Sequence, residues 1–401
     1  MTAWAGSTAK TLTLRHRPRP APAAGPQLSV RTTTAEPLAP RIYQPHYRCI
    51  TRTFLMSDIN RQWIYSKPVS GSLKHENFTL EENPIPKLRQ GQVLVRNKLI
   101  SMDPANRTYF VMQAYRPQLK LGDVMAGFAI GEVIKSTDMR FRRGDLIHGD
   151  LGWQDYAVIN SYERSEFIYK CTPGYSEDDL LGVLGITGLT AYFGVQEVGK
   201  LVPGETVVVG GATGACGVIV GQLAKIAGCR VIGFGGGPEK CRWLIDEMGF
   251  DAAVDYKSDH VAADLAALCP DGVDFFSDAV GGVVTQSTLP LMKQGARWYH
   301  YGNVSSYDSI TPGEALRQDD SLTPELLKLC QERNLKPVFL LVFDFYCQRR
   351  RAEAELAQYM REGKLKAPVT TIEGFDKLPE ALINGTFGGK HYGKLSVRIA
   401  S

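Results

Sequence analysis

Two hydrophobic patterns follow one another along most of the chain. From residue 61 to about residue 177, short runs such as "GQVLVRNKLISMD" alternate apolar and polar residues and are separated by glycine turns. Alternation with a period of two residues is typical of half-buried β-strands. The sequence therefore predicts a mostly β domain, which we bound at residues 56–180.

After this domain, strand and helix patterns alternate. "DDLLGVLGITGLTAYFGVQEVGK" is helical in pattern, and helices are also predicted from about Ala215 to Ala227 and over "PEKCRWLIDEMG". The predicted strands are "ETVVVGG", "RVIGFGGG", "AAVDY", "GVDFFSDAVGG", "ARWYHYGNV" and "KPVFLLVFD". Strands that alternate with helices form right-handed βαβ units and a parallel sheet. We place this α/β domain at residues 181–345.

The last segment, residues 346–401, holds a helix pattern, "AEAELAQYMREGK", and a final strand pattern, "GKLSVRIA". We predict that this strand pairs back with the first domain. The segment is therefore interpreted as a C-terminal return to the β domain.

Residues 1–55 have no periodic pattern. They hold eight Lys and Arg residues and one acid, Glu36, so their net charge is +7. Such a composition cannot bury enough apolar surface to fold. Three interpretations compete: a disordered tail, a cleaved transit peptide, or an extension upstream of a true start at Met56. We favour the third interpretation, and we expect residues 1–55 to be dispensable.

Charge and cysteine usage exclude several function classes. The whole chain carries +4, so the part after residue 55 carries −3, whereas nucleic-acid binders usually have a basic folded body. No apolar run approaches the roughly 18 residues of a membrane span. The eight cysteines are scattered without a CxxC pair, which is typical of reduced thiols. We expect a cytoplasmic protein that binds neither nucleic acid nor membrane.

One glycine-rich turn carries the strongest functional signal. In "VVVGGATGACGVIVGQLAKIAG", a buried strand runs into Gly211, Gly214 and Gly217, and a small-residue helix begins at about Ala215. Such a turn lets a pyrophosphate approach the backbone, and the helix N-terminus stabilises its charge. The sequence therefore predicts a dinucleotide site, although the spacing is GxxGxxG rather than GxGxxG.

The next strand indicates which dinucleotide is bound. NAD sites usually place Asp or Glu at the end of this strand to bind the ribose hydroxyls. Here Phe234 to Gly237 include no acid, and Lys240 follows within reach of a 2′-phosphate. The sequence therefore predicts NADP(H). The alternative is that Lys240 is only a solvated helix residue.

A catalytic zinc is not expected. Between Met56 and Leu180 only His75, His148 and Cys171 could supply ligands, and they share no known ligand spacing. We interpret His148 as a strand-end histidine rather than a ligand.

Hydroxyl groups must then polarise a substrate carbonyl, which suits hydride addition to an enone, where charge develops on the enolate oxygen. The stretch "YHYGNVSSYDS" offers four of them, on Tyr301, Ser305, Ser306 and Tyr307. Tyr307 is either the donor to that oxygen or a loop residue that packs on the cofactor.

From Met56 onward, the chain resembles the zinc-free medium-chain reductases. It is most similar to prostaglandin/leukotriene reductases, plant alkenal reductases and bacterial curcumin-reductase-like proteins. The stretches that carry the resemblance are "SMDPANR", "GFAIGEVIKS", "GITGLTAYFG", "GATGACGVIVGQLAK", "GFDAAVDYK", "DAVGG", "YGNVSSY" and "IEGFDKLP". The resemblance implies a Rossmann doubly wound parallel sheet combined with a GroES-like β domain.

The resemblance also implies roles for residues. Lys240 and Tyr256 match the residues that hold the 2′-phosphate, Gly302 to Tyr307 match the segment along the nicotinamide ribose, and Tyr307 matches the tyrosine near the substrate carbonyl. With the glycine turn, the expected cofactor-binding residues are Gly211, Gly214, Ala215, Cys216, Gly217, Lys240, Tyr256, Gly302, Asn303, Ser305, Phe339, Leu340 and Leu341. The last three match a strand beside the nicotinamide.

Three departures from the family pattern concern the substrate side. Ala279 stands where the family has asparagine, "DPANR" replaces "DPYMR", and His391 occupies a second asparagine position. The resemblance implies NADPH-dependent reduction of the activated C=C bond of an enone or enal, with a homodimer among the expected assemblies. The proton for the α-carbon comes from Tyr307 or from water. The alternatives are a quinone oxidoreductase and an NADPH-binding protein without significant turnover.

Overall fold

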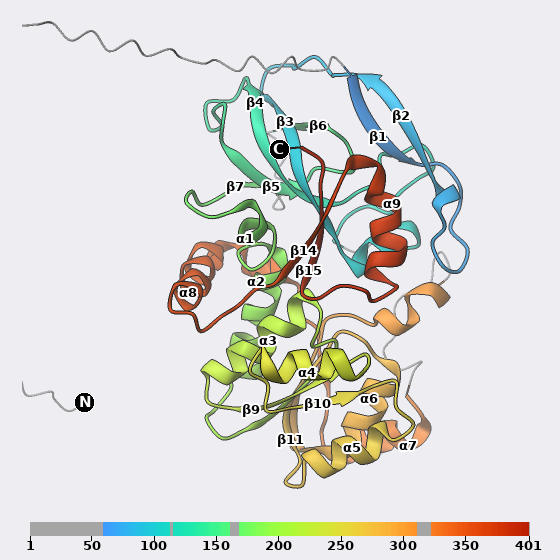
Figure 1. The fold of residues 1–401 in the computed structure, drawn as a ribbon, viewed down its shortest axis with the longest axis vertical. Helices are drawn as coiled ribbons and strands as arrows, with labels where there is room; N and C mark the ends of the chain where they lie inside the picture. The colour runs from blue at the N-terminus through green and yellow to red at the C-terminus, as the bar shows by residue number, and fades with distance from the viewer. Residues whose placement is uncertain (1–58, 113–114, 161–167, 311–321, 401) are drawn as a thin grey trace, which may run out of the picture. The chain divides into compact units, whose positions relative to one another are not determined.

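The computed structural model describes residues 59–112, 115–160, 168–310 and 322–400, all within one compact unit, Met56–Ser401. The expectations for residues 1–55 lie outside the described residues. Two large sheets organise the described part (Figure 1). A separate antiparallel pair joins β1 (Ile59–Tyr65) to β2 (Phe78–Pro84).

The first large sheet has seven strands and is mixed. Its neighbours in order are β14 (Val369–Glu373), β15 (Lys394–Arg398), β3 (Gln92–Met102), β4 (Phe128–Ser136), β5 (Leu146–Asp150) and β7 (Tyr169–Lys170), and β6 (Tyr156–Asn160) also pairs with β3. The side chains that alternate toward its interior include Val93, Val95 and Ile147, all fully buried. The predicted β pattern of the N-terminal half is thus confirmed.

The end of the chain completes this sheet. Strand β15 runs antiparallel to β3, with Leu395 opposite Met102, and parallel to β14, with Lys394 opposite Val369. The prediction that the last strand pairs back with the first part of the chain is therefore confirmed.

The second large sheet is parallel throughout. Its strands lie in the order β10 (Ala252–Asp255), β9 (Arg230–Gly235), β8 (Thr206–Val209), β11 (Val273–Asp278), β12 (Met292–His300) and β13 (Pro337–Val338). In chain order this is 3-2-1-4-5-6, the order of a doubly wound dinucleotide-binding sheet. The predicted Rossmann architecture is confirmed.

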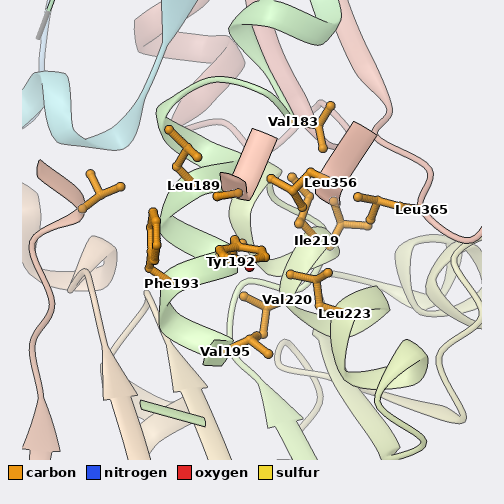
Figure 2. Packing of buried hydrophobic residues seen from close by; sticks show 14 of the residues in the cluster. Val183, Leu189, Tyr192, Phe193, Val195, Ile219, Val220, Leu223, Leu356 and Leu365 are labelled. Carbon is orange, nitrogen blue, oxygen red and sulfur yellow. The ribbon is translucent and has the colours of Figure 1, made fainter. Parts of the chain in front are cut away.

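Helices cover both faces of the parallel sheet, and the side chains of each strand alternate between them. Val207 and Phe275 belong to a core with α2 (Ile186–Phe193), α3 (Ala215–Ile226) and α8 (Arg349–Arg361), part of which is drawn in Figure 2. Val208 and Phe276 belong to a second core with α5 (Val261–Leu268), α6 (Gly282–Thr288) and α7 (Pro324–Glu332). Strands buried on both faces explain the continuous apolar runs in the sequence.

Helix α4 (Pro238–Asp246) also packs on the parallel sheet, against β9 and β10. The remaining elements are shorter. They are the helices α1 (Glu177–Leu181) and α9 (Leu378–Glu380), the π-helical turns η3 (Gly194–Gly199) and η9 (Ala381–Thr386), and the 3₁₀ turns η1 (His75–Asn77), η2 (Pro104–Phe110), η4 (Leu289–Leu291), η5 (Val304–Ser309), η7 (Val342–Gln348) and η8 (Phe375–Lys377). The turns η2 and η5 pack against each other.

Two predicted elements were wrong in extent. The helix predicted over residues 178–200 is interrupted between Leu181 and Ile186, where the backbone turns at glycines, and it ends in η3. The strand predicted over "KPVFLLVFD" ends at Val338, so Phe339, Leu340 and Leu341 lie beyond β13 and not in a strand. These three residues connect the strand to η7, where the apolar run continues as a 3₁₀ turn.

Candidate active site

The predicted glycine turn lies between β8 and α3. Gly211 has a φ of +64°, which L side chains rarely adopt, and Gly214 is the N-cap of α3. A Cβ on Gly217 would stand 2.3 Å from the Gly211 carbonyl oxygen, so only glycine allows the helix to pack this closely. A Cβ on Gly214 would meet only that same oxygen within 4 Å, at 3.2 Å, so its outer side is otherwise open. The turn therefore leaves room for a group at the first N–H groups of α3.

The loop after β11 lies beside this turn and is organised by a buried carboxylate. Asp278 is fully buried, and its Oδ1 accepts hydrogen bonds from the N–H groups of Val280 (2.8 Å) and Gly281 (3.1 Å). Its Oδ2 accepts one from the Thr285 hydroxyl and lies 3.5 Å from His300 Nδ1. The Asp278 carboxylate thus ties the loop after β11 to Thr285 and lies close to the end of β12.

The predicted segment after β12 docks on that loop. The N–H of Val304 donates to Ala279 O (3.1 Å), and the N–H of Ser305 donates to Val280 O (2.9 Å). Gly302 lies two residues after the end of the strand, and Asn303 is buried, with an Oδ1 that has no hydrogen-bond partner among the described residues. An acceptor left free in this way could take a hydroxyl or an amide of a bound group.

Tyr307 lies on η5 and is 6% exposed. Its hydroxyl oxygen accepts a 3.4 Å hydrogen bond from the N–H of Asn303. Burial raises the pKa of Tyr307, and the Asn303 bond opposes the shift only in part. The hydroxyl therefore keeps its proton near neutral pH and can donate it in a hydrogen bond.

The other hydroxyl candidates are placed differently. Ser306 Oγ donates to the Asn303 carbonyl (3.0 Å), and Ser305 is exposed. The hydroxyl of Tyr301 is enclosed and faces the thiol of Cys216, whose pKa burial raises to about 12. Cys216 is therefore a neutral thiol in the first turn of α3.

Lys240 and Tyr256 follow two neighbouring strands, β9 and β10. Lys240 is in the first turn of α4, and its Nζ donates to Gly389 O (2.8 Å) and lies 5.4 Å from the ring centre of Tyr392. Burial, and then the charge of Lys257, lowers the pKa of Lys240. The Tyr256 hydroxyl lies 2.7 Å from the place that a Cβ would take on Gly236. The ammonium groups of Lys240 and Lys257 therefore lie close enough to repel each other, and such a pair of cations suits a phosphate.

The structure brings most of the predicted residues to one edge of the parallel sheet. Tyr256 follows β10, Lys240 follows β9, the glycine turn follows β8, and Tyr307 lies beyond β12. Ligands of open α/β sheets bind at the carboxyl ends of the strands. Along this edge lie donors for a pyrophosphate at α3, cations for a further phosphate at Lys240 and Lys257, and an acceptor for a ribose or amide at Asn303. The residues therefore fit a dinucleotide.

The three residues after β13, which the sequence predicted to line the cofactor site together, differ in how far they are exposed. Leu340 is buried and Leu341 is partly buried against the core of the sheet, whereas Phe339 is 66% exposed. Phe339 is thus less suited to the enclosed end of a cofactor site than its two neighbours are.

Sequence reasoning missed three functional candidates. Lys257 directly follows Tyr256 and had a recognisable signal, since a second cation beside Lys240 favours a phosphate. Asp278 lies within the predicted strand "GVDFFSDAVGG", where the sequence gives it no role of its own. The contact of Arg107 with Asp308 joins residues 201 positions apart in the chain, and no pattern in the sequence indicates it.

The three candidate zinc ligands are placed apart from any ligand cluster. His148 is buried within β5, with its ring stacked between Phe128 and Tyr169 at 5.6 and 4.9 Å between centroids. Burial lowers the pKa of His148 to about 3, and Arg349 and Lys394 add to the shift. Over residues 59–112, 115–160, 168–310 and 322–400, no group of three or more His, Cys, Asp or Glu side chains could hold a metal ion. His148 is a neutral core residue within β5.

Among the described residues, no helix combines the length and the apolar character that crossing a membrane requires.

Two family models match the chain. One, described as the N-terminal domain of oxidoreductase, matches residues 61–166. The other, described as zinc-binding dehydrogenase, matches residues 215–326, which include Gly217 and the loops after β11 and β12 but begin after Gly214. The two matches therefore cover parts of both large sheets.

Known proteins match the chain over nearly all of their own length. The NADPH-dependent curcumin reductase of Escherichia coli (strain K12) is 34% identical over 345 residues, which are 85% of this chain and 97% of that protein. Prostaglandin reductase 1 of Bos taurus is 30% identical over 340 residues, which are 84% and 98%. The crystal structure of CurA from Vibrio vulnificus in complex with NADPH is 32% identical, with a TM-score of 0.77 over 85% of this chain and 99% of that one. These matches confirm the predicted combination of a Rossmann sheet and a GroES-like β domain.

Proposed function

Because this chain belongs to the zinc-free reductase group of the medium-chain dehydrogenase/reductase family, we propose that it reduces the activated C=C bond of α,β-unsaturated ketones or aldehydes. It is an oxidoreductase of small molecules, and its cofactor is NADP(H). The enone or enal substrate class is the further step that the proposal takes.

The cofactor would be held along the carboxyl edge of the parallel sheet. The first N–H groups of α3 would hold the pyrophosphate, and Lys240, Lys257 and Tyr256 would hold the 2′-phosphate. The segment from Gly302 to Tyr307 would accompany the nicotinamide ribose. When bound, NADPH supplies a hydride to the substrate.

The observation that carries the proposal is the state of the Tyr307 hydroxyl. It accepts a hydrogen bond from the backbone, which leaves its own proton for another acceptor, and it is buried, which moves its pKa still further above neutral pH. Hydride addition to the β-carbon of an enone places negative charge on the carbonyl oxygen. A preorganised donor in a buried place stabilises such a charge much better than water does.

The test is a screen of enones, enals and quinones in which NADPH consumption is followed and the products are identified. We expect turnover of enones or enals, with the saturated ketone or aldehyde as product. Turnover of quinones alone would support a quinone oxidoreductase instead. NADPH binding without turnover of any acceptor would contradict the proposal as a whole.

Tyr307→Phe is expected to lower kcat by about 10-fold or more, less than the 10²-fold often lost with an oxyanion donor, because the ribose 2′-hydroxyl can share the role. The substitution keeps the ring and its packing. The dissociation constant of NADPH should change little, because its phosphate contacts lie elsewhere. Steady-state rates with several enones and a fluorescence titration with NADPH would measure both. Equal kcat in the variant and the parent would show that Tyr307 only packs.

Exhaustive chelation is expected to leave NADPH oxidation unchanged. The candidate ligand His148 is enclosed between two aromatic rings, and burial in the core lowers its pKa. The measurement is the initial rate before and after chelation, with a zinc-dependent alcohol dehydrogenase as the positive control. A loss of rate that added zinc restores would contradict this expectation.

A further inference from the structure

Among the described residues, Arg107 is an almost completely buried cation in the β-rich part of the chain. Its side chain is 1% exposed, and it lies on η2, which packs against η5. Nη2 donates to Gly71 O (2.9 Å), whereas Nε and Nη1 have no hydrogen-bond partner among the described residues. A buried cation with so few partners depends strongly on any nearby negative charge.

That negative charge is supplied by Asp308. Its Oδ1 lies 3.6 Å from Arg107 Nε, and its Oδ2 accepts a 2.7 Å hydrogen bond from the Ser72 hydroxyl. The Asp308 side chain is 48% exposed, so it reaches from the surface toward the enclosed guanidinium. Burial lowers the pKa of Arg107, and Asp308 opposes this shift. The carboxylate therefore bridges two points, Arg107 and Ser72, on the neighbouring part of the chain.

Asp308 directly follows Tyr307 on η5. The start of this turn is fixed by the bonds of Val304 and Ser305 to the loop after β11. Near its end, the contacts of the Asp308 carboxylate hold it from the opposite side. A turn of six residues fixed at both ends leaves the tyrosine between them little freedom.

We propose that Arg107 is a positioning residue for the reduction: its ion pair with Asp308 fixes η5 and thereby the place of the Tyr307 hydroxyl. This inference rests on the proposed function, because it gives Tyr307 the role of donor to the substrate oxygen. A misplacement on the order of 1 Å can cost about 10²-fold in rate, so a contact behind a donor can act on kcat.

A merely structural ion pair would behave differently. Its loss would lower stability and would change cofactor binding, kcat and KM by the same factors whether or not the Tyr307 hydroxyl is present. A positioning pair acts on kcat through one hydroxyl, so its effect disappears once that hydroxyl is removed. Two substitutions that act through the same group are strongly non-additive, which a double-mutant cycle measures.

The experiment compares Asp308→Asn in the full chain with the parent, using NADPH and the enone that is turned over best. Asparagine keeps the size of the side chain and a hydrogen bond to Ser72 but removes the charge. We expect kcat to fall about 5- to 10-fold, with the dissociation constant of NADPH within about twofold of the parent value. The same substitution in the Tyr307→Phe background should change kcat by less than about twofold.

Arg107 variants give a second, independent comparison. Arg107→Lys keeps the charge and should retain several-fold more kcat than Arg107→Gln, once thermal unfolding has shown that both are folded. If neither variant folds, the Asp308→Asn cycle alone decides, because Asp308 is half-exposed and its loss leaves the core intact. The matched control is Glu332→Gln, which breaks the exposed Lys328–Glu332 pair on α7 and should leave kcat unchanged.

The outcomes separate this inference from the function on which it rests. If Tyr307→Phe lowers kcat but Asp308→Asn does not, the positioning role is wrong and the proposed function stands. Equal losses from Asp308→Asn in the two backgrounds would also overturn the positioning role. If Tyr307→Phe has no effect at all, the donor role of the hydroxyl fails, and the positioning role fails with it.

Discussion

Lys240→Ala is expected to weaken NADPH binding by about 10- to 150-fold, the equivalent of about 1.5–3 kcal/mol for a charge-assisted hydrogen bond. The ammonium group of Lys240 is partly buried beside Lys257, and the 2′-phosphate of NADPH would relieve the repulsion between the two cations. NADH lacks this phosphate, so its affinity should barely change. Fluorescence titrations with both cofactors at fixed ionic strength measure the two effects.

A second variant separates charge from packing at this position. Lys240 also donates to Gly389 O, so alanine removes a contact with the C-terminal segment as well as the charge. Lys240→Gln keeps a donor for that carbonyl, and it should lose as much NADPH affinity as the alanine variant. Lys328→Ala, on the exposed face of α7, is the control and should bind both cofactors normally. If NADPH and NADH weaken equally, Lys240 has a structural role and the phosphate assignment is wrong.

The lowered pKa of Lys240 predicts that the preference for NADPH over NADH depends on pH. Burial, and then Lys257, lowers the pKa of Lys240, so its charge is lost at a lower pH than that of a free lysine. The preference for NADPH over NADH should therefore shrink as the pH rises toward that pKa. In Lys240→Gln the remaining preference should be less sensitive to alkaline pH.

Helices and strands with a clear hydrophobic periodicity or a clear starting signal were predictable from sequence. Elements without such a signal were not. Helix α3 follows small residues after a glycine turn, and it begins at Ala215 as predicted. Strand β13 was overextended, because an apolar run such as "VFLLVF" has no period that distinguishes a strand from a 3₁₀ turn. Its end is set by tertiary contacts, in which Leu340 turns into the core while Phe339 does not.

The candidate site divides in a similar way. Residues that act through the backbone or through a bare charge, such as Gly214 and Lys240, follow from local sequence, since the turn or the strand end fixes their place. Residues that act by holding other site residues in place cannot be recognised from local sequence. Asp278 is significant because four groups converge on it. Arg107 is significant because Asp308, far away in the chain, lies beside it.

Asp278→Ala is expected to lower the free energy of unfolding by about 3–5 kcal/mol. The carboxylate is fully buried and accepts three hydrogen bonds, from two backbone N–H groups and from the Thr285 hydroxyl. Alanine would leave these donors without their partner in a place where water has little access, and each unsatisfied group costs about 1–3 kcal/mol. Urea denaturation followed by tryptophan fluorescence gives the change in free energy.

Asp278→Asn is the matched variant, and it should cost only about 1–2 kcal/mol because its carbonyl oxygen can still accept from Val280 and Gly281. The loop that Asp278 holds also receives the N–H groups of Val304 and Ser305, so the alanine variant should lose NADPH affinity as well as stability. The asparagine variant, in which the loop keeps its shape, should bind NADPH nearly as the parent does. An alanine variant within about 1 kcal/mol of the parent would mean that water replaces the carboxylate at this site. The loops after β11 and β12 would then be held by their direct backbone bonds rather than by Asp278.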